Sequence, residues 1–251
     1  MTAALFPNKK PPYICTPLTG KNKEEIRAEL KSIIAKSPDM IEWRADCFQA
    51  LHDAESVLAV AEEISSSGKP VLFTIRSEKE GGEKISLSEE EKIHLLCEIC
   101  KHSAVAIIDF EVSNNPDYIK KLRKISKQYN KKMILSYHNF DCTPQTSDIM
   151  KHAFKAEFYE ADIAKIAVMP KTKEDVLRLL EITKETDEAL TIPIVTMSMG
   201  AMGSLSRIVG WAYGSIITFG LSVQGSAPGQ VPIDKLRKLI EMTQDTVGEW
   251  R

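Results

Sequence analysis

The chain lacks three features that would assign it at once to a broad class of protein. It has little excess charge of either sign, with a net charge of -2 and a pI near 6.3, so its composition gives no general attraction to nucleic acid or to an anionic membrane. It has no apolar run that approaches the length of a membrane span. Its first residues also lack the long apolar core of a signal peptide. We therefore expect a cytoplasmic protein.

The cysteines and glycines do not form the motifs that mark disulfide, zinc or dinucleotide-binding proteins. The five cysteines have an odd count and scattered spacing, which argues against a disulfide framework. Cys97 and Cys100 form a C-x-x-C without a second pair, and both fall on one face of a helical pattern, so we expect small buried side chains and no metal site. Residues 16–20, after the first predicted strand, contain no G-x-G-x-x-G.

What the chain does have is a regular alternation of apolar strands and helical patterns. The predicted strands cover residues 13–18, 40–44, 71–75, 105–108, 133–137, 161–168, 192–197 and 215–219. Strands separated by helices need crossover connections and form a parallel sheet. Such units repeated along 251 residues predict an α/β fold, a single (β/α)8 barrel domain over residues 1–251. A doubly wound open sheet is the structural alternative, and the missing glycine-rich loop counts against it.

Several helix starts are marked by capping residues. Ser88 with Glu91 forms a capping box, and Asn115 is followed by proline at the first helical position. Thr143 is also followed by proline, which predicts a third start of this kind. A short helix is expected over residues 204–211.

Lys165 lies in an unusually apolar stretch, residues 161–170. Because side chains alternate along a strand, Lys165 shares one face with Ile163 and Ala167, while Ala164 and Ile166 share the other. An amine desolvated among such neighbours is a nucleophile for carbonyl carbon. Most lysines near strand ends instead extend their charged heads into water, so this stretch alone leaves both interpretations open.

Polar residues gather where the predicted strands end, which is where active sites of such barrels lie. His138 is the one histidine that ends a predicted strand, so it can face Lys165 and shuttle protons for it. For Asp46, Asp109 and Glu111 we favour structural ion pairs. The arginines at the rim indicate an anionic substrate, because arginine holds carboxylate or phosphate with paired hydrogen bonds.

The ordered motifs around these residues resemble those of type I 3-dehydroquinate dehydratases, the Schiff-base class. The matching segments are residues 42–46, 74–77, 80–82, 109–111, 136–140, 165–170, 197–200 and 226–230, with Arg207 in its expected place. They run in order across almost the whole chain. Any one segment alone is a weak signal, whereas the ordered set is highly specific.

The resemblance implies syn dehydration of 3-dehydroquinate to 3-dehydroshikimate through a lysine imine, the third step of the shikimate pathway of aromatic amino acid biosynthesis. It implies that Lys165 forms the imine, His138 transfers protons and Glu80 orients His138. Arg207 is expected to hold the substrate carboxylate. The full set of expected substrate-binding residues is Thr16, Glu42, Arg44, Arg76, Met197, Met199, Arg207, Phe219, Ser226 and Gln230.

The resemblance also implies that no metal or organic cofactor is needed and that the protein is a homodimer. The loop over 225–230, with Gly225 and Gly229 as hinges, is expected to act as a lid. Two other functions remain open at this point. One is a different Schiff-base barrel such as a class I aldolase, for which the glycine-rich phosphate site after strands seven and eight is only faintly present. The other is a non-catalytic binding barrel.

Overall fold

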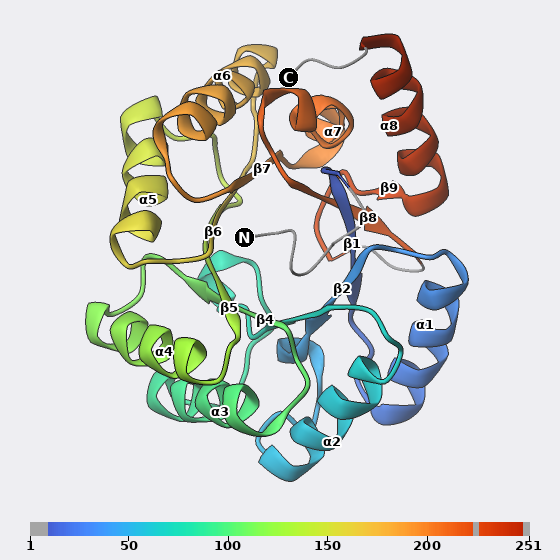
Figure 1. Cartoon of the computed structure of the whole chain (residues 1–251), viewed down its shortest axis with the longest axis vertical. Helices are drawn as coiled ribbons and strands as arrows, with labels where there is room; N and C mark the ends of the chain where they lie inside the picture. Colours follow the sequence, from blue (N-terminus) through green and yellow to red (C-terminus); the bar gives the residue numbers. More distant parts are fainter. Residues whose placement is uncertain (1–9, 223–225, 248–251) are drawn as a thin grey trace.

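The computed structural model, which describes residues 10–222 and 226–247, is a (β/α)8 barrel, as predicted (Figure 1). The strands are β1 (Tyr13–Leu18), β2 (Met40–Arg44), β3 (Val71–Thr74), β4 (Ile107–Glu111), β5 (Lys132–Asn139), β6 (Ile163–Val168), β7 (Ile194–Ser198), β8 (Ile217–Leu221) and the short β9 (Val231–Pro232). The helices are α1 (Lys23–Ala35), α2 (Ala54–Ser65), α3 (Glu89–His102), α4 (Pro116–Gln128), α5 (Thr146–Phe158), α6 (Lys173–Ala189), α7 (Gly200–Val209) and α8 (Ile233–Val247). Short 3-10 turns are η2 (Ala45–Cys47), η3 (Glu78–Glu80) and η4 (Gly210–Tyr213).

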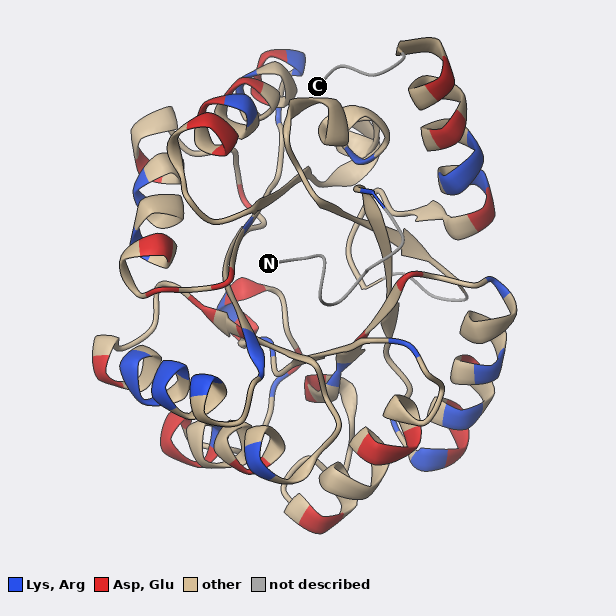
Figure 2. Cartoon of the chain, in the orientation of Figure 1, with Lys and Arg blue, Asp and Glu red and all other residues tan. Residues whose placement is uncertain are grey.

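The sheet is parallel throughout and closes on itself. Its strand order is β7-β6-β5-β4-β3-β2-β1-β8-β9, and each pair of neighbours in this order is parallel. An isolated parallel bridge between Ile194 and Ser215 joins the start of β7 to the segment before β8. The helices surround this ring, and all of them except α2 and α7 carry residues of both charge signs (Figures 1 and 2). Among the described helices, none combines the length and apolar character needed to cross a membrane.

Alternating side chains divide the core into an inner and an outer layer. On β6, Ile163 and Ala167 belong to the cluster inside the ring, whereas Ala164 and Ile166 pack in the cluster between sheet and helices. The predicted face assignment of this strand is therefore confirmed, and Lys165 points inward with Ile163 and Ala167. Phe219 on β8 also belongs to the inner cluster.

Capping residues predict the starts of α3 and α4 correctly but not the start of α5. The capping box at Ser88 and the Asn115 cap before Pro116 are both present. The start at Thr143 is wrong, because α5 begins at Thr146 with an N-cap that makes no side-chain bond. Thr143 instead donates its hydroxyl to the Met169 carbonyl at 3.2 Å, a contact made across the fold.

Other boundaries near the strand ends also differ from expectation. Strands β4 and β5 continue through Asp109 and His138, which pair in the sheet with Ile134 and Ala167. Their polar side chains have buried partners, Arg76 and Glu80. The helix expected over 204–211 begins earlier, at Gly200, where β7 has just ended. Strand β8 starts two residues later than predicted, after Ser215 has donated its hydroxyl back to the Thr196 carbonyl at 3.4 Å.

Candidate active site

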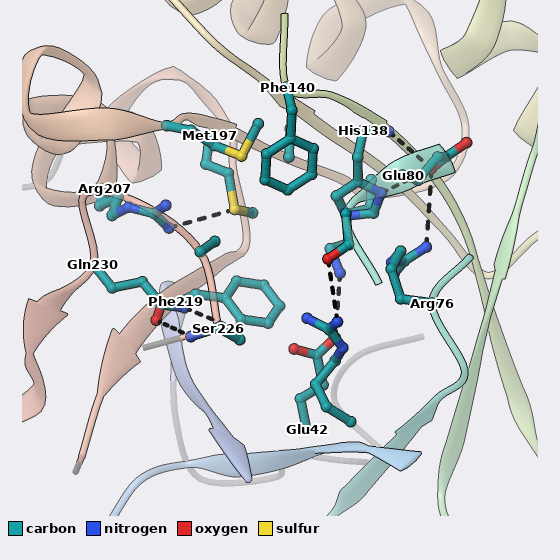
Figure 3. Close-up of a pocket in the computed structure, with 16 residues that line it drawn as sticks. Glu42, Arg76, Glu80, His138, Phe140, Met197, Arg207, Phe219, Ser226 and Gln230 are labelled. Carbon is teal, nitrogen blue, oxygen red and sulfur yellow. Dashed lines mark hydrogen bonds and ion pairs between the residues drawn. The ribbon is translucent and has the colours of Figure 1, made fainter. Parts of the chain in front are cut away.

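A pocket opens at the carboxyl ends of the strands, and all of the expected site residues except Thr16 line it (Figure 3). Those residues are Glu42, Arg44, Arg76, Glu80, His138, Lys165, Met197, Met199, Arg207, Phe219, Ser226 and Gln230. Thr16 is fully buried on the outer face of β1 and donates its hydroxyl to the Gly220 carbonyl at 2.9 Å. Its neighbour Cys15 takes the inward position, so the structure does not bring Thr16 to the pocket.

Lys165 reaches the pocket floor between two carboxylates. Its side chain is 4% exposed, and its Nζ lies 3.3 Å from Asp109 Oδ2 and 3.5 Å from Glu42 Oε1. The ring of Phe219 lies below the same nitrogen, 4.8 Å from Nζ to the ring centroid. The apolar setting expected from the strand sequence is therefore wrong for the amine itself. Paired anions and an aromatic face at this nitrogen stabilise a positive charge that develops there.

The Glu80 carboxylate holds His138 through both its backbone and its ring. Glu80 Oε2 accepts from the His138 backbone N–H at 3.0 Å and lies 2.9 Å from His138 Nδ1. Burial, followed by the positive charges of Arg76 and Lys165, lowers the pKa of His138 well below its usual value. A neutral imidazole that donates Nδ1–H to Glu80 leaves Nε2 as an acceptor toward the pocket, where it can act as a base.

Burial also raises the pKa of Glu80, to about 7, although the nearby Arg76 guanidinium opposes the shift. The Ser113 hydroxyl donates to Glu80 Oε1 at 2.7 Å. The turn that carries Glu80 depends on two glycines. Gly81 has φ +84°, and a β-carbon there would overlap the Phe140 ring, while one on Gly82 would overlap the Arg76 carbonyl.

Arg76 joins the carboxylates on this side of the pocket. Its Nη2 donates to Asp109 Oδ1 at 2.7 Å, and its Nη1 donates to Glu111 Oε1 at 3.2 Å and to Ser136 Oγ at 2.8 Å. Although burial raises the pKa of Asp109, Arg76 and Lys165 hold it below its ordinary value. The ion pairs favoured for Asp109 and Glu111 are therefore present.

Arg44 is likewise neutralised within the protein. Its guanidinium makes a bidentate pair with Asp46, from Nε to Oδ1 at 2.9 Å and from Nη2 to Oδ2 at 2.7 Å. This is the ion pair that we favoured for Asp46. Arg44 still lines the pocket, so it can meet a ligand with its remaining N–H groups.

Arg207, on α7, is buried without an anionic partner among the described residues. Its Nη2 donates to the Pro228 carbonyl at 3.2 Å, its Nη1 lies 3.4 Å from Met197 Sδ, and its Nε has no hydrogen-bond partner. Burial lowers the pKa of Arg207 to about 10. A buried cation that lacks a counter-ion is costly, and an anionic ligand in this pocket would supply one.

The segment after β8 covers the Arg207 side of the pocket. Ser226 and Gln230 bond to each other, from the Ser226 backbone N–H to Gln230 Oε1 at 2.9 Å (Figure 3). The Pro228 carbonyl also accepts from the Gly200 backbone N–H at 3.1 Å, which ties the segment to the start of α7. Gly225, one of the two expected hinges, lies outside the described residues.

Two further groups lie in the site that the sequence did not single out. Phe140 lines the pocket beside His138, and Asp109 contacts the Lys165 amine, where we expected only a structural pair. The alternation along β4 carries the signal for Asp109, because Ile107 belongs to the inner cluster and Asp109 lies two residues further on. Within the described part of the chain, no cluster of three or more His, Cys, Asp or Glu residues is arranged to hold a metal ion.

Fold and pocket together define an α/β-barrel enzyme. Comparison with known proteins then identifies the family: residues 14–246 match the model of type I 3-dehydroquinase, and the chain belongs to that family. A 3-dehydroquinate dehydratase of Geobacillus thermodenitrificans is 44% identical over 241 residues, which cover 95% of this chain and 93% of the relative.

Solved structures agree with this assignment. The crystal structure of 3-dehydroquinate dehydratase from Geobacillus kaustophilus is 41% identical, with a TM-score of 0.92 over 96% of this chain and 93% of that one. A type I 3-dehydroquinate dehydratase from Clostridium difficile, crystallised with covalently modified comenic acid, is 36% identical. Its TM-score is 0.91, over 95% of this chain and 94% of that one.

Proposed function

We propose that this protein dehydrates 3-dehydroquinate to 3-dehydroshikimate, as a hydro-lyase of the shikimate pathway. The observation that carries the proposal is a pocket with a lysine amine on its floor and a buried, unpaired arginine in its wall. The substrate has the two matching groups, a ring ketone and a carboxylate. Membership of the type I 3-dehydroquinase family, whose members act through a lysine imine, supports the same reaction.

In the first stage, Lys165 attacks the ketone carbon. The nitrogen forms a bond to that carbon, His138 carries protons from the nitrogen to the oxygen, the oxygen leaves as water, and a protonated imine results. The positive charge then lies on a nitrogen flanked by Glu42 and Asp109, at 3.5 Å and 3.3 Å from Lys165 Nζ in the free protein. The imine acidifies the adjacent C–H bond and takes up the electrons released there, so no metal or organic cofactor is required.

In the second stage, His138 Nε2 takes the proton from the acidified carbon. The electrons of that C–H bond pass into the imine and give an enamine. The enamine then expels the hydroxyl and forms the imine-conjugated double bond, and His138 returns the proton so that the group departs as water. One histidine on one ring face serves both transfers, which makes the elimination syn. Glu80 supports the imidazolium formed between them. Water then hydrolyses the imine to release product and free Lys165.

Binding is assigned to the groups around these two residues. Arg207 holds the substrate carboxylate, and Ser226 and Gln230 close over it. Glu42, Arg44 and Arg76 meet the ring hydroxyls. Met197, Met199 and Phe219 form apolar walls beside the ring.

Trapping the imine tests the proposal directly. The protein is incubated with 3-dehydroquinate and borohydride, and the reduced adduct is located by peptide mass spectrometry. We expect the substrate mass on Lys165 alone, and conversion of 3-dehydroquinate seen as the ultraviolet absorbance of the conjugated product. An adduct on another lysine, no adduct, or turnover of sugar phosphates in place of 3-dehydroquinate would each overturn the assignment.

We also propose that the chain works as one domain, as a homodimer, in the cytoplasm. The closed sheet uses strands from both ends of the chain, which supports a single domain. Exposed apolar side chains, including Leu177 on α6, Leu205 on α7 and Met242 on α8, give surfaces that a second copy could cover. Light scattering after size-exclusion chromatography distinguishes a dimer from a monomer.

A further inference from the structure

Lys92 is a second buried lysine, and no step of the proposed reaction uses it. It lies in the first turn of α3 and is 1% exposed. Its Nζ lies 3.2 Å from Glu111 Oε2 and 5.6 Å from the centroid of the Phe110 ring. It does not line the active-site pocket. Lysine is almost never fully buried unless it is paired, so its partner Glu111 is the place to look for its role.

Glu111 connects Lys92 to Arg76 through its two oxygens. Oε2 faces Lys92, while Oε1 accepts from Arg76 Nη1 at 3.2 Å and from the Ser77 backbone N–H at 2.7 Å. Glu111 is 3% exposed, and so is Arg76. Charges buried in this way are poorly screened by solvent, so a change in the charge of Lys92 alters the electrostatic interactions of Arg76.

Arg76 in turn reaches both reacting groups of the proposed mechanism. Its Nη2 donates to Asp109, which contacts the Lys165 amine. Its Nη1 lies 3.9 Å from Glu80 Oε2, the oxygen that holds the His138 ring (Figure 3). Glu80 and Glu111 therefore share one guanidinium nitrogen. If the charge of Glu111 is less neutralised, Arg76 interacts more strongly with Glu111 and less strongly with Glu80.

We propose, on the basis of the proposed function, that Lys92 is a positioning residue for the Glu80–His138 pair. Lys92 neutralises Glu111 at Oε2, the oxygen that does not face Arg76. Arg76 therefore remains able to interact with Glu80 and Asp109. Without Lys92, the cations Arg76 and Lys165 face a surplus of buried carboxylates. Those carboxylates are Glu42, Glu80, Asp109 and Glu111.

The surroundings of the pair fix the direction of the effect. The charged groups that act on it are Arg44, Arg76, Asp109, Glu111 and Lys165. After burial, Arg76 is the strongest influence on the pKa of Glu80 and lowers it, whereas Glu111 raises it. Removing the positive charge of Lys92 leaves the charge of Glu111 to be balanced by Arg76 alone, so Arg76 stabilises the Glu80 carboxylate less. Glu80 then holds its proton to higher pH.

The test measures kcat/KM for 3-dehydroquinate against pH in a double-mutant cycle of Lys92→Met and Glu111→Gln. For Lys92→Met we expect the low-pH limb of this profile to shift to higher pH by about one unit. Activity should be about tenfold lower than wild type at pH 6 and close to wild type at a pH where Glu80 is ionised. Lys92→Arg, which keeps the charge, restores the limb. Glu111→Gln alone moves the limb to lower pH.

The cycle also separates positioning from packing. In the Glu111→Gln background, Lys92→Met has no further effect on the limb if Lys92 acts through Glu111. Lys101→Met is the matched control, because Lys101 forms a partly exposed ion pair with Glu98 on the same helix, at 2.9 Å, away from Glu111. It leaves the pH profile unchanged. A Lys92→Met protein with an unmoved limb, or an equal loss of activity at every pH, overturns the proposal.

If Lys92→Met does not fold, Glu111→Gln and the double variant still test the proposal. It is overturned if the low-pH limb of the pH profile does not shift to lower pH in these variants, or if the limb lies at a different pH in the two. A readout independent of turnover separates this inference from the proposed function. The protonation midpoint of the His138 ring, followed by NMR on ring-labelled protein, moves up in Lys92→Met. No turnover by the wild type contradicts the proposed function, whereas an unshifted His138 midpoint contradicts the role of Lys92.

Discussion

On the β2–β6 side of the pocket each buried cation lies against carboxylates, whereas on the β7–β8 side Arg207 lies against a thioether and a backbone carbonyl. Arg44, Arg76 and Lys165 all have acidic partners within 3.5 Å. Arg207 has none among the described residues, and its Nε is unbonded. Both sides are almost fully buried, so the difference lies in charge balance and not in exposure.

The comparison separates two tasks within one pocket. The β2–β6 side is complete before any ligand arrives, and its paired charges fix the positions of Lys165 and His138 in advance. The β7–β8 side is left incomplete, and the ligand carboxylate completes it. Residues on the first side should therefore affect stability and catalysis together. Arg207 should affect ligand binding while contributing little to stability.

The largest expected effect is that of Lys165→Ala. Turnover should fall on the order of 10⁴-fold or more, as it does when a covalent nucleophile is removed. The free energy of unfolding should also fall, by roughly 3–5 kcal/mol, because Glu42 and Asp109 lose their shared cation. Steady-state kinetics and urea unfolding measure the two effects. Lys171→Ala, at an exposed lysine after β6, is the control and should change neither.

Arg207→Met and Arg76→Met test the comparison itself. For Arg207→Met, KM should rise about 10²-fold or more, since losing one partner of a buried charge pair costs roughly 2–5 kcal/mol of binding. Its free energy of unfolding should stay the same or rise, because an unpaired buried cation is removed. Arg76→Met should instead lose roughly 3–5 kcal/mol of stability. If both variants lose equal stability, the two sides do not differ as described.

The sequence was sufficient for the parts of the fold that depend on local pattern. Alternation along 161–168 placed Lys165 inward, and Ser88 and Asn115 marked real helix starts. Thr16 is expected in the site, whereas the structure puts it on the outer face of β1, beside the inward Cys15. The period-two pattern puts these two residues on opposite faces, but both faces of the strand carry apolar residues, so which one points inward depends on the assembled ring.

Other features depend on partners that are distant in sequence. The start of α5 shifts because Thr143 bonds to Met169 and because Arg178 donates to the Thr143 carbonyl at 3.3 Å. The carboxylates around Lys165 come from β2 and β4, so the strand of Lys165 gave no sign of them. The unpaired state of Arg207 is also a property of the assembled pocket. A sequence names an arginine but does not show whether an acidic residue reaches it.

The pH dependence of Glu80 probes the β2–β6 side with a smaller effect. Since its pKa is about 7, activity should fall as pH drops through about 7, when the carboxylate that supports His138 gains a proton. Stability should change in the opposite direction. A pKa raised above 4.5 in the fold contributes stability that is complete below pH 4.5 and is lost as pH rises through about 7. Glu80→Gln should remove both trends, seen in pH–rate profiles and in unfolding at pH 4.5 to 8.

The smallest expected effect concerns the segment that covers Arg207. Gly229 has φ +77°, and a β-carbon there would overlap the Gly200 carbonyl, so Gly229→Ala should weaken docking of the segment on α7. With a strain of about 1–2 kcal/mol, KM should rise roughly five- to thirtyfold while kcat changes less. Gly68→Ala is the matched control, since Gly68 has φ +76° with open space around it. It should cost similar stability and leave KM unchanged. A KM unaffected by Gly229→Ala would mean that the β7–β8 side binds the carboxylate through Arg207 without a docked cover.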